Sequence, residues 1–127
     1  MLGVLDMGKI LVVDDSRFAR LCLSKALVEV GYEVFEMDGA GEIVDFYESH
    51  RPDMVLMDIA MEGCDGLQST EELLARFPEA RVVVCSACAQ QATVVQALKA
   101  GAVDFLPKPV DRDRLLRVVS SLLNQGR

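Results

Sequence analysis

The stretch that most constrains the fold is a run of four apolar residues, 54–57, which ends at Asp58 and precedes a glycine-punctuated segment, 59–66. A continuous apolar run of this length, followed by a turn signal, predicts a strand that is buried on both faces. Such strands are typical of parallel sheets covered by helices on both sides, and ligands bind at the carboxyl ends of these strands. Asp58 therefore lies where an open α/β sheet binds its ligands, although a strand-end aspartate can also simply cap the following turn.

Length and composition favour one domain. The chain has 127 residues, of which 51% are hydrophobic, and this length can bury a core without disulfides. We find no apolar run of membrane-spanning length and no signal peptide, so we expect a cytoplasmic protein without a membrane partner. The net charge of −7 argues against nucleic-acid binding. We expect a short leader at 1–8, a domain at 9–124 and a tail at 125–127.

Apolar runs alternate with helical patterns along the chain. Strands are predicted at Lys9–Val13, Tyr32–Met37, the segment ending at Asp58, Arg81–Cys85 and Val103–Leu106. The helices between and after them have apolar positions at helical spacing, which are Ala19, Leu23, Ala26, Leu27 and Val30; Ile43, Val44 and Tyr47; Leu67, Thr70, Leu74 and Phe77; the segment Gln90–Ala100; and Leu115, Val118, Val119 and Leu122. Ser16 and Asp111 are the expected starts of the first and last helices.

The alternation predicts the fold class. Parallel strands need right-handed crossovers with a covering helix, so the pattern predicts an α/β domain with a five-stranded parallel sheet between helices. The usual strand order for five such units is the flavodoxin-like order 2-1-3-4-5, whose switch point lies between the first and third strands. That order brings the strand ends carrying Asp14, Asp15 and Asp58 together.

Polar residues at the predicted strand ends indicate a phosphoryl-transfer site. Asp14 and Asp15 follow the first strand, Asp58 ends the third, Ser86 follows the fourth, and Lys108 follows the fifth. Three close carboxylates repel one another unless a cation or shifted pKa values compensate, and Mg²⁺ with oxygen ligands fits such a group. Together with an ammonium and a hydroxyl, the cation would neutralise charge on a transferring phosphoryl group, and a carboxylate can accept that group.

The segments Ile10–Ser16, Met57–Met61, Cys85–Ala87 and Gly101–Pro109 together resemble the receiver domains of two-component response regulators. The resemblance covers roughly Lys9 to Leu123, with the motifs in the family's order and spacing. Within the family, the stretches Ile10–Ser16 and Val84–Ala92 look particularly similar to CheY-type receivers of chemotaxis.

The resemblance implies a role for each site residue. Asp58 would accept the phosphoryl group from a sensor histidine kinase, which makes the chain a phosphoacceptor that assists its own phosphorylation and dephosphorylation rather than a conventional enzyme. Mg²⁺ would be bound by Asp15, Asp58 and the carbonyl of Ala60, with Asp14 acting largely through water. Ser86 and Lys108 would contact the phosphoryl oxygens.

The resemblance also implies a switch. Phe105 would be the aromatic switch residue, and the Lys108–Pro109 peptide bond would be cis. The downstream target would be the flagellar motor switch, for a CheY-like protein acting alone, or the output domain of a larger regulator.

This sequence departs from the family pattern at several positions. Glu62 stands where the family often has proline, which predicts a more flexible loop beside Asp58, and Phe105 lacks the hydroxyl of the more usual tyrosine. Ala60 and Cys88 occupy the positions that flank the route of hydrolytic water in the family. Both side chains are small, so they leave the lifetime of the phosphoryl group open.

Other interpretations stay open at this stage. Asp14, Asp15 and Ser86 could serve local turns, Lys108 could be a solvated surface lysine, and Phe105 could be a core residue. A small phosphatase that turns over an aspartyl phosphate is the rival function, but such enzymes usually carry a second acid where this chain has Ala60. A degenerate interaction domain is a third possibility.

The cysteines, the histidine and the fourth predicted helix complete the candidates. Cys22, Cys64, Cys85 and Cys88 are expected to be reduced thiols, because no second Cys/His pair completes a zinc site around the last two. We expect Cys85 to be a buried strand residue, whereas Cys64 and Cys88 could link oxidation to Asp58. His50 is expected to be an exposed helix-end residue. The helix at Gln90–Ala100 carries a single charge, which favours a docking surface.

Overall fold

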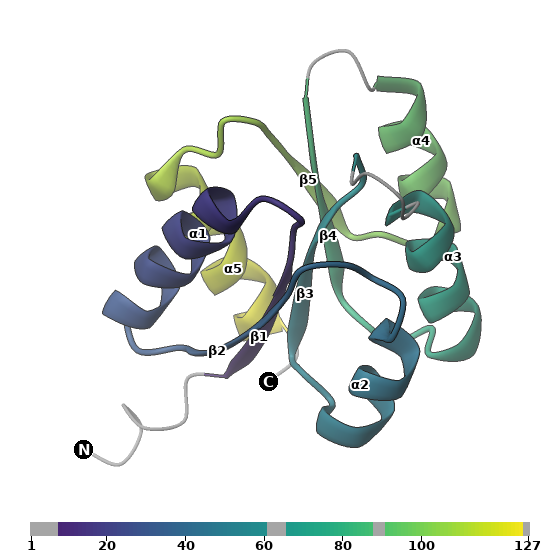
Figure 1. The fold of residues 1–127 in the computed structure, drawn as a ribbon, viewed down its shortest axis with the longest axis horizontal. Coiled ribbons are helices and arrows are strands. Elements are labelled where there is room, and N and C mark those ends of the chain that lie inside the picture. The colour runs from purple at the N-terminus through teal and green to yellow at the C-terminus, as the bar shows by residue number, and fades with distance from the viewer. Residues whose placement is uncertain (1–7, 61–65, 88–90, 126–127) are drawn as a thin grey trace.

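The computed structural model describes residues 8–60, 66–87 and 91–125, in which five strands alternate with five helices (Figure 1). The strands are β1 (Lys9–Val13), β2 (Glu33–Met37), β3 (Met54–Asp58), β4 (Val82–Ser86) and β5 (Asp104–Pro107). The helices are α1 (Arg17–Glu29), α2 (Ile43–His50), α3 (Gly66–Arg76), α4 (Gln91–Ala100) and α5 (Arg112–Gln125). The strands pair in parallel in the order β2-β1-β3-β4-β5, which confirms the predicted fold class. Among these helices we find none with the length and apolar character to span a membrane.

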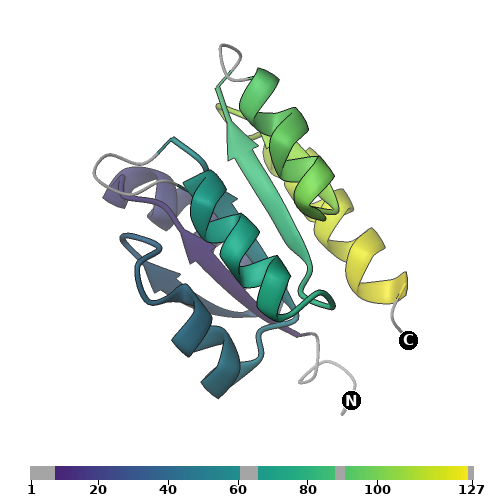
Figure 2. The same cartoon turned by 90° about the vertical axis from the view of Figure 1, so that its right-hand side faces the viewer.

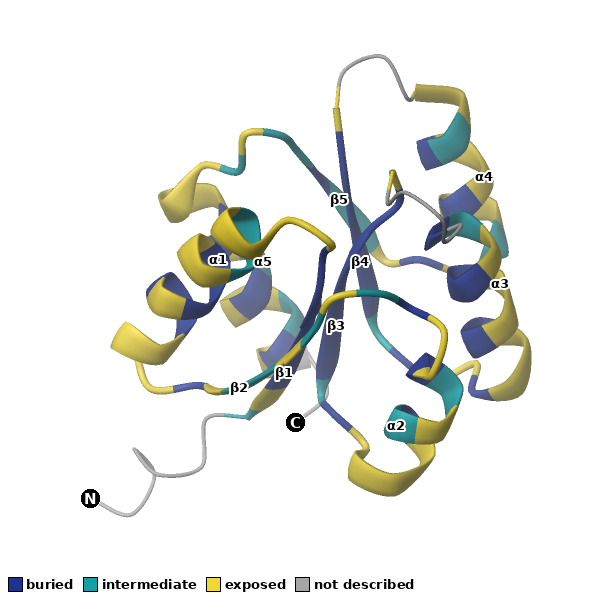
Figure 3. Cartoon of the chain, viewed as in Figure 1, coloured by how far each residue is buried: buried dark blue, intermediate teal, exposed yellow. Residues whose placement is uncertain are grey.

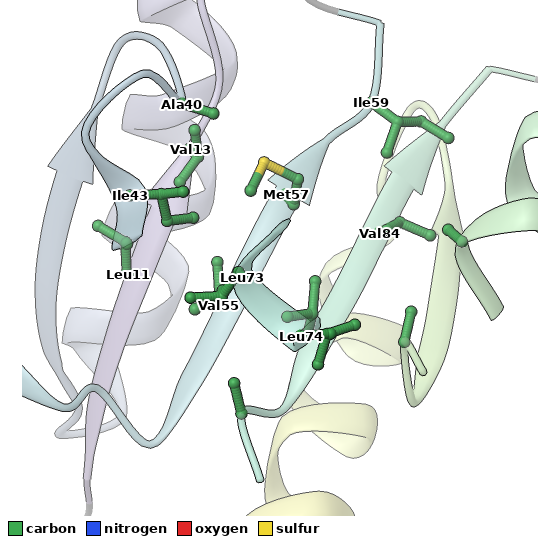
Figure 4. Packing of buried hydrophobic residues seen from close by; sticks show 14 of the residues in the cluster. Leu11, Val13, Ala40, Ile43, Val55, Met57, Ile59, Leu73, Leu74 and Val84 are labelled. Atoms are coloured by element: carbon green, nitrogen blue, oxygen red, sulfur yellow. The ribbon is translucent and has the colours of Figure 1, made fainter. Parts of the chain in front are cut away.

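The helices cover the sheet on both faces. Helices α1 and α5 lie on one face, and α2, α3 and α4 lie on the other (Figures 1 and 2). Because successive strand residues point to opposite faces, β1 divides its apolar side chains between two cores, with Leu11 facing α2–α4 and Ile10 facing α1 and α5. Figure 4 shows Leu11 and Val55 from the sheet packing with Leu73 from α3. The buried positions lie along the central strands, while the outer helix surfaces are exposed (Figure 3).

The predicted helix starts are confirmed by capping hydrogen bonds. The Ser16 hydroxyl accepts a hydrogen bond from the Ala19 amide (3.2 Å), and the Asp111 carboxylate accepts one from the Arg114 amide (2.9 Å). Each satisfies a backbone donor that the first helical turn leaves without a partner. The Ser16 cap fixes where α1 begins, directly after the acidic pair that follows β1.

Several details of the predicted core are wrong. Val30 was expected on the inward face of the first helix, but it lies past the end of α1 and is 37% exposed. Val118 and Leu122 face inward as predicted and are partly buried against the core, but Leu123, which was not among the predicted core positions, is buried more deeply than either. The observed β2, β4 and β5 each begin one residue later than predicted. The spacing of apolar residues indicates whether a segment is a helix or a strand. The elements packed against it decide which of its residues are most buried and where it ends.

Candidate functional site

The carboxyl ends of the strands bring three acidic side chains together. The strand arrows in Figure 2 point the same way, so the residues that end or follow β1 and β3 lie at one edge of the sheet. Asp14 and Asp15 follow β1 and Asp58 ends β3, and one ligand atom from each of the three lies within 4.8 Å of the others. Asp14 and Asp58 are buried, whereas Asp15 is exposed.

Each buried carboxylate uses its two oxygens for different purposes. Oδ1 of Asp14 accepts a hydrogen bond from the Ser16 amide (2.9 Å), and Oδ1 of Asp58 accepts one from the Ala60 amide (3.0 Å). Both Oδ2 atoms face the Lys108 ammonium, at 2.8 Å from Asp14 and 3.1 Å from Asp58. Each carboxylate therefore caps a turn with Oδ1 and faces the lysine of the site with Oδ2, so the two roles are not alternatives.

Lys108 reaches this site from the far end of the chain. Its amide donates a hydrogen bond to the Ser86 carbonyl (2.7 Å), which fixes the segment after β5 against the end of β4. The Lys108–Pro109 peptide bond is cis, as expected. Ser86 is itself buried at the end of β4. The structure thus places Lys108 in an ion-paired site rather than on the solvated surface, and it places Ser86 at the end of the strand next to β3.

Burial and the neighbouring charges shift the pKa of Asp58 and of Lys108. Burial raises the pKa of Asp58, and the charge of Asp14 adds to this, while the Ala60 amide and Lys108 oppose it. For Lys108, burial alone would lower the pKa, but the hydrogen bonds and negative charges of Asp14 and Asp58 outweigh it and raise the pKa. The ion pair between Lys108 and Asp58 favours the charged form of both residues, yet at Asp58 the effect of burial is larger and the pKa is raised. Its carboxylate is therefore poorly compensated without a further cation.

The donor set fits Mg²⁺. Three carboxylates offer oxygen ligands within 4.8 Å of one another, and Lys108 supplies a single positive charge to them. A hard divalent cation prefers a few carboxylate oxygens with water completing its coordination. Asp15 is exposed and borders solvent, from which the remaining ligands would come.

Gly66 lets α3 begin directly against Asp58. A Cβ atom at this position would collide with the Asp58 carbonyl oxygen and would lie 2.6 Å from Ile59 Cα. The Gly66 carbonyl also accepts a hydrogen bond from the buried Thr70 hydroxyl (2.8 Å), one turn further along α3. In the sequence this glycine indicates only a turn after the strand, because a lone glycine at a helix start carries no signal for such a contact.

Arg20 is a second residue that the sequence analysis missed. Its Nη1 donates a hydrogen bond to the main-chain carbonyl of Asp14 (2.8 Å), and its Nε pairs with the Glu36 carboxylate (3.3 Å). Its side chain is only 16% exposed. The available signal was a basic residue five positions after the acidic pair, but its partners are a backbone carbonyl and the Glu36 carboxylate on β2.

Phe105 and Ser86 line one groove. A cavity of about 370 Å³ lies between α4 and β5, and its lining residues are Ser86, Ala87, Gln91, Val94, Val95, Leu98, Phe105 and Pro107. Phe105 is half-buried, with the Arg114 guanidinium 6.0 Å from its ring centroid. In α4 only Val94 and Ala97 are buried, and Val95 and Leu98 are exposed. The apolar character of α4 therefore does not come from burial alone.

Of the remaining candidate residues, the structure describes some and not others. Cys85 is buried, and burial raises the pKa of its thiol to about 12, which confirms the expected buried strand cysteine. His50 is exposed at the end of α2, and its ring stacks on Phe46 at 4.2 Å between centroids. Glu62, Cys64 and Cys88 lie outside the described residues, so the proposals about the adjacent loop, hydrolytic water and oxidation are not tested.

Comparison with known proteins identifies relatives over nearly the whole chain. The sequence model of the response regulator receiver domain matches residues 10–120. The chemotaxis protein CheY of Bacillus subtilis (strain 168) is 40% identical over 117 residues, covering 91% of this chain and 98% of that protein.

Two solved structures from Brucella abortus are also similar. The receiver domain of NtrX has a TM-score of 0.85 at 33% identity, covering 91% of this chain and 98% of that one. A longer NtrX chain has a TM-score of 0.87 at 32% identity, and the match covers 94% of this chain but only 28% of that one. The similarity therefore extends both to a protein of about this length and to one part of a longer regulator.

Proposed function

The chain belongs to the response regulator receiver family, and within this CheY-like signalling family we propose that it accepts a phosphoryl group on Asp58 from a phosphohistidine of a sensor kinase. The observation that carries this proposal is the meeting of three carboxylates and one ammonium at the ends of β1, β3 and β5. We propose a cytoplasmic location, where the kinase has access to ATP.

The transfer follows from the arrangement of the site. A carboxylate oxygen of Asp58 attacks the phosphorus, the bond from phosphorus to the imidazole nitrogen breaks, and its electron pair returns to that nitrogen, which takes up a proton. Asp14, Asp15, Asp58 and the Ala60 carbonyl would hold Mg²⁺, which when bound supplies positive charge to the transferring oxygens. Lys108 adds its charge, and Ser86 donates a hydrogen bond. The chain thus assists its own phosphorylation and dephosphorylation without being a conventional enzyme.

Removal of Mg²⁺ is expected to abolish loading of the site. In Mg²⁺, beryllofluoride should bind at Asp58 and shift the amide resonances of Ser86 and Phe105, and EDTA should reverse these shifts completely because the three carboxylates again repel the anion. Two-dimensional ¹H–¹⁵N NMR measures both states. Asp58→Asn serves as the control that should show no shift in either. Shifts that persist in EDTA would contradict the proposed magnesium site.

The groove between α4 and β5 is the proposed route from phosphorylation to a partner. Ser86 and Phe105 line it together, so a phosphoryl group that draws the Ser86 hydroxyl toward Asp58 would make room for the Phe105 ring to turn inward. The exposed side chains of Val95 and Leu98 line the groove and offer an apolar docking surface there. The partner is the flagellar motor switch for a CheY-like protein, or an output domain for a receiver within a longer regulator.

A charge on α4 is expected to separate binding from phosphorylation. Gln91 lines the groove and Gln96 is exposed on the same helix, so Gln91→Lys or Gln96→Lys should weaken binding to purified flagellar motor switch protein about tenfold, because the bound surface would bury an unpaired charge. Phosphorylation by acetyl phosphate should be unchanged. Gln68→Lys on the exposed side of α3 is the matched control. Loss of phosphorylation in the α4 variants would argue against a docking role.

A further inference from the structure

Arg20 contacts the main chain of the acidic site but is not one of the residues proposed to bind Mg²⁺. We propose that Arg20 is a positioning residue, which fixes the peptide bond between Asp14 and Asp15 and thereby directs the Asp15 carboxylate toward Mg²⁺. This inference rests on the proposed function and extends it, because it assigns a role in metal affinity to a side chain that touches neither the cation nor the phosphoryl group.

The main chain at Asp14 is held on both sides. Its amide donates a hydrogen bond to the Met37 carbonyl at the end of β2 (3.1 Å), and its carbonyl accepts one from Arg20 Nη1 (2.8 Å). Its side chain is held by Ser16 and Lys108. Asp14 is thus held at every polar atom, and Arg20 holds the carbonyl of the peptide unit that joins Asp14 to Asp15.

That contact bears directly on Asp15. The Asp14 carbonyl and the Asp15 amide belong to one planar peptide unit, so fixing the carbonyl fixes where the Asp15 Cα and side chain begin. The Asp15 side chain is exposed and short, so the position of its Cα decides whether its carboxylate can reach a cation held beside Asp58. Holding the backbone in that position lowers the backbone entropy that would otherwise be lost when a cation binds.

Glu36 in turn orients Arg20. The guanidinium is planar and presents several donors at fixed angles, so one arginine can serve the Asp14 carbonyl and the Glu36 carboxylate together. A lysine has one ammonium on a flexible stem. By contrast, the Arg76–Glu48 pair joins α3 to α2 at the same 3.3 Å but with both side chains more than half exposed, and it is distant in the chain from the acidic residues.

The test measures Mg²⁺ affinity and the Asp15 backbone separately. Isothermal titration calorimetry should show the Kd for Mg²⁺ rising about tenfold in Arg20→Ala, the effect of removing a residue that orients a ligand. Glu36→Gln should show a smaller rise, and Arg20→Lys should recover only part of the affinity. In the metal-free protein, ¹H–¹⁵N NMR should show the Asp15 amide resonance shifting in Arg20→Ala. Arg76→Ala, the matched control, should change neither measurement.

The outcomes distinguish this inference from the proposed function. If the unsubstituted protein binds Mg²⁺ and is phosphorylated on Asp58, while Arg20→Ala binds Mg²⁺ within twofold of it, the positioning role is wrong and the proposed function stands. An affinity loss in Arg20→Ala that Arg20→Lys fully restores would also overturn it, since charge alone would then suffice. If the unsubstituted protein does not bind Mg²⁺, the proposed function fails, and the metal role of Arg20 fails with it.

Discussion

Asp58→Asn is expected to abolish phosphorylation and, in metal-free protein at neutral pH, to raise the temperature of unfolding. The first effect follows because the amide cannot act as the nucleophile, so labelling by acetyl phosphate should fall by at least about a hundredfold. The second follows because burial and Asp14 make the charged form of Asp58 costly. An uncharged side chain of the same shape removes that cost, although it also loses its ion pair with Lys108.

The stability gain should depend on pH in a defined direction. Burial raises the pKa of Asp58 in the folded protein, so the folded state binds the proton more tightly than the unfolded state does. Stability is therefore lost as the pH rises from the unfolded pKa of about 4 through the raised folded pKa. The difference in unfolding temperature between Asp58→Asn and the unsubstituted protein should be largest above this pH range. It should shrink as the pH falls toward about 4.

Thermal unfolding in EDTA, followed by circular dichroism at several pH values, measures this difference. Asp53→Asn is a suitable control, because Asp53 lies at the opposite end of β3 and accepts a hydrogen bond from the Lys9 amide. A lower unfolding temperature for Asp58→Asn at neutral pH would show that the Lys108 pair outweighs desolvation. Phosphate label that persists in Asp58→Asn would refute the assignment of the acceptor.

Gly66→Ala is expected to destabilise the fold by about 3 kcal/mol, the upper part of the usual range for overpacking. The added methyl group would overlap the Asp58 carbonyl oxygen and the Ile59 backbone, and backbone atoms cannot rotate away as a flexible side chain can. Either α3 or the end of β3 must move. Since Asp58 ends β3, we expect Mg²⁺ binding to weaken as well as stability.

Urea unfolding measures the free-energy change, and calorimetry measures the Mg²⁺ affinity. Gly41→Ala is the matched control, because a Cβ there meets nothing within 4 Å, so stability should stay within about 0.5 kcal/mol of the unsubstituted protein. Equal stabilities for Gly66→Ala and Gly41→Ala would mean that α3 can shift without cost. The close approach at Asp58 would then have no energetic consequence.

The fold could be predicted because its signals are local. Apolar runs such as 54–57 are long enough to define buried strands, and Ser16 and Asp111 mark where the first and last helices start. Val30 and Leu123 were misjudged because one lies just past a helix end and the other on a helix whose phase depends on its packing against the sheet. Such phase errors follow from tertiary contacts that no single segment records.

For the site, the sequence predicted which groups converge but not how each oxygen is used. Asp14 and Lys108 follow strands and Asp58 ends one, so the fold class alone brings them to one edge. Arg20 was missed because it acts on a carbonyl, and a carbonyl belongs to every residue type. Gly66 was missed because it matters for lacking a side chain where α3 contacts the end of β3, and that contact exists only in the folded chain.

The ion pair between Lys108 and Asp14 joins positions that are 94 residues apart in the chain. During synthesis, both acidic partners of Lys108 are therefore made before it. The ion pair can form only after β5, the last strand of the sheet, has been synthesised and has delivered Lys108 to the acidic residues.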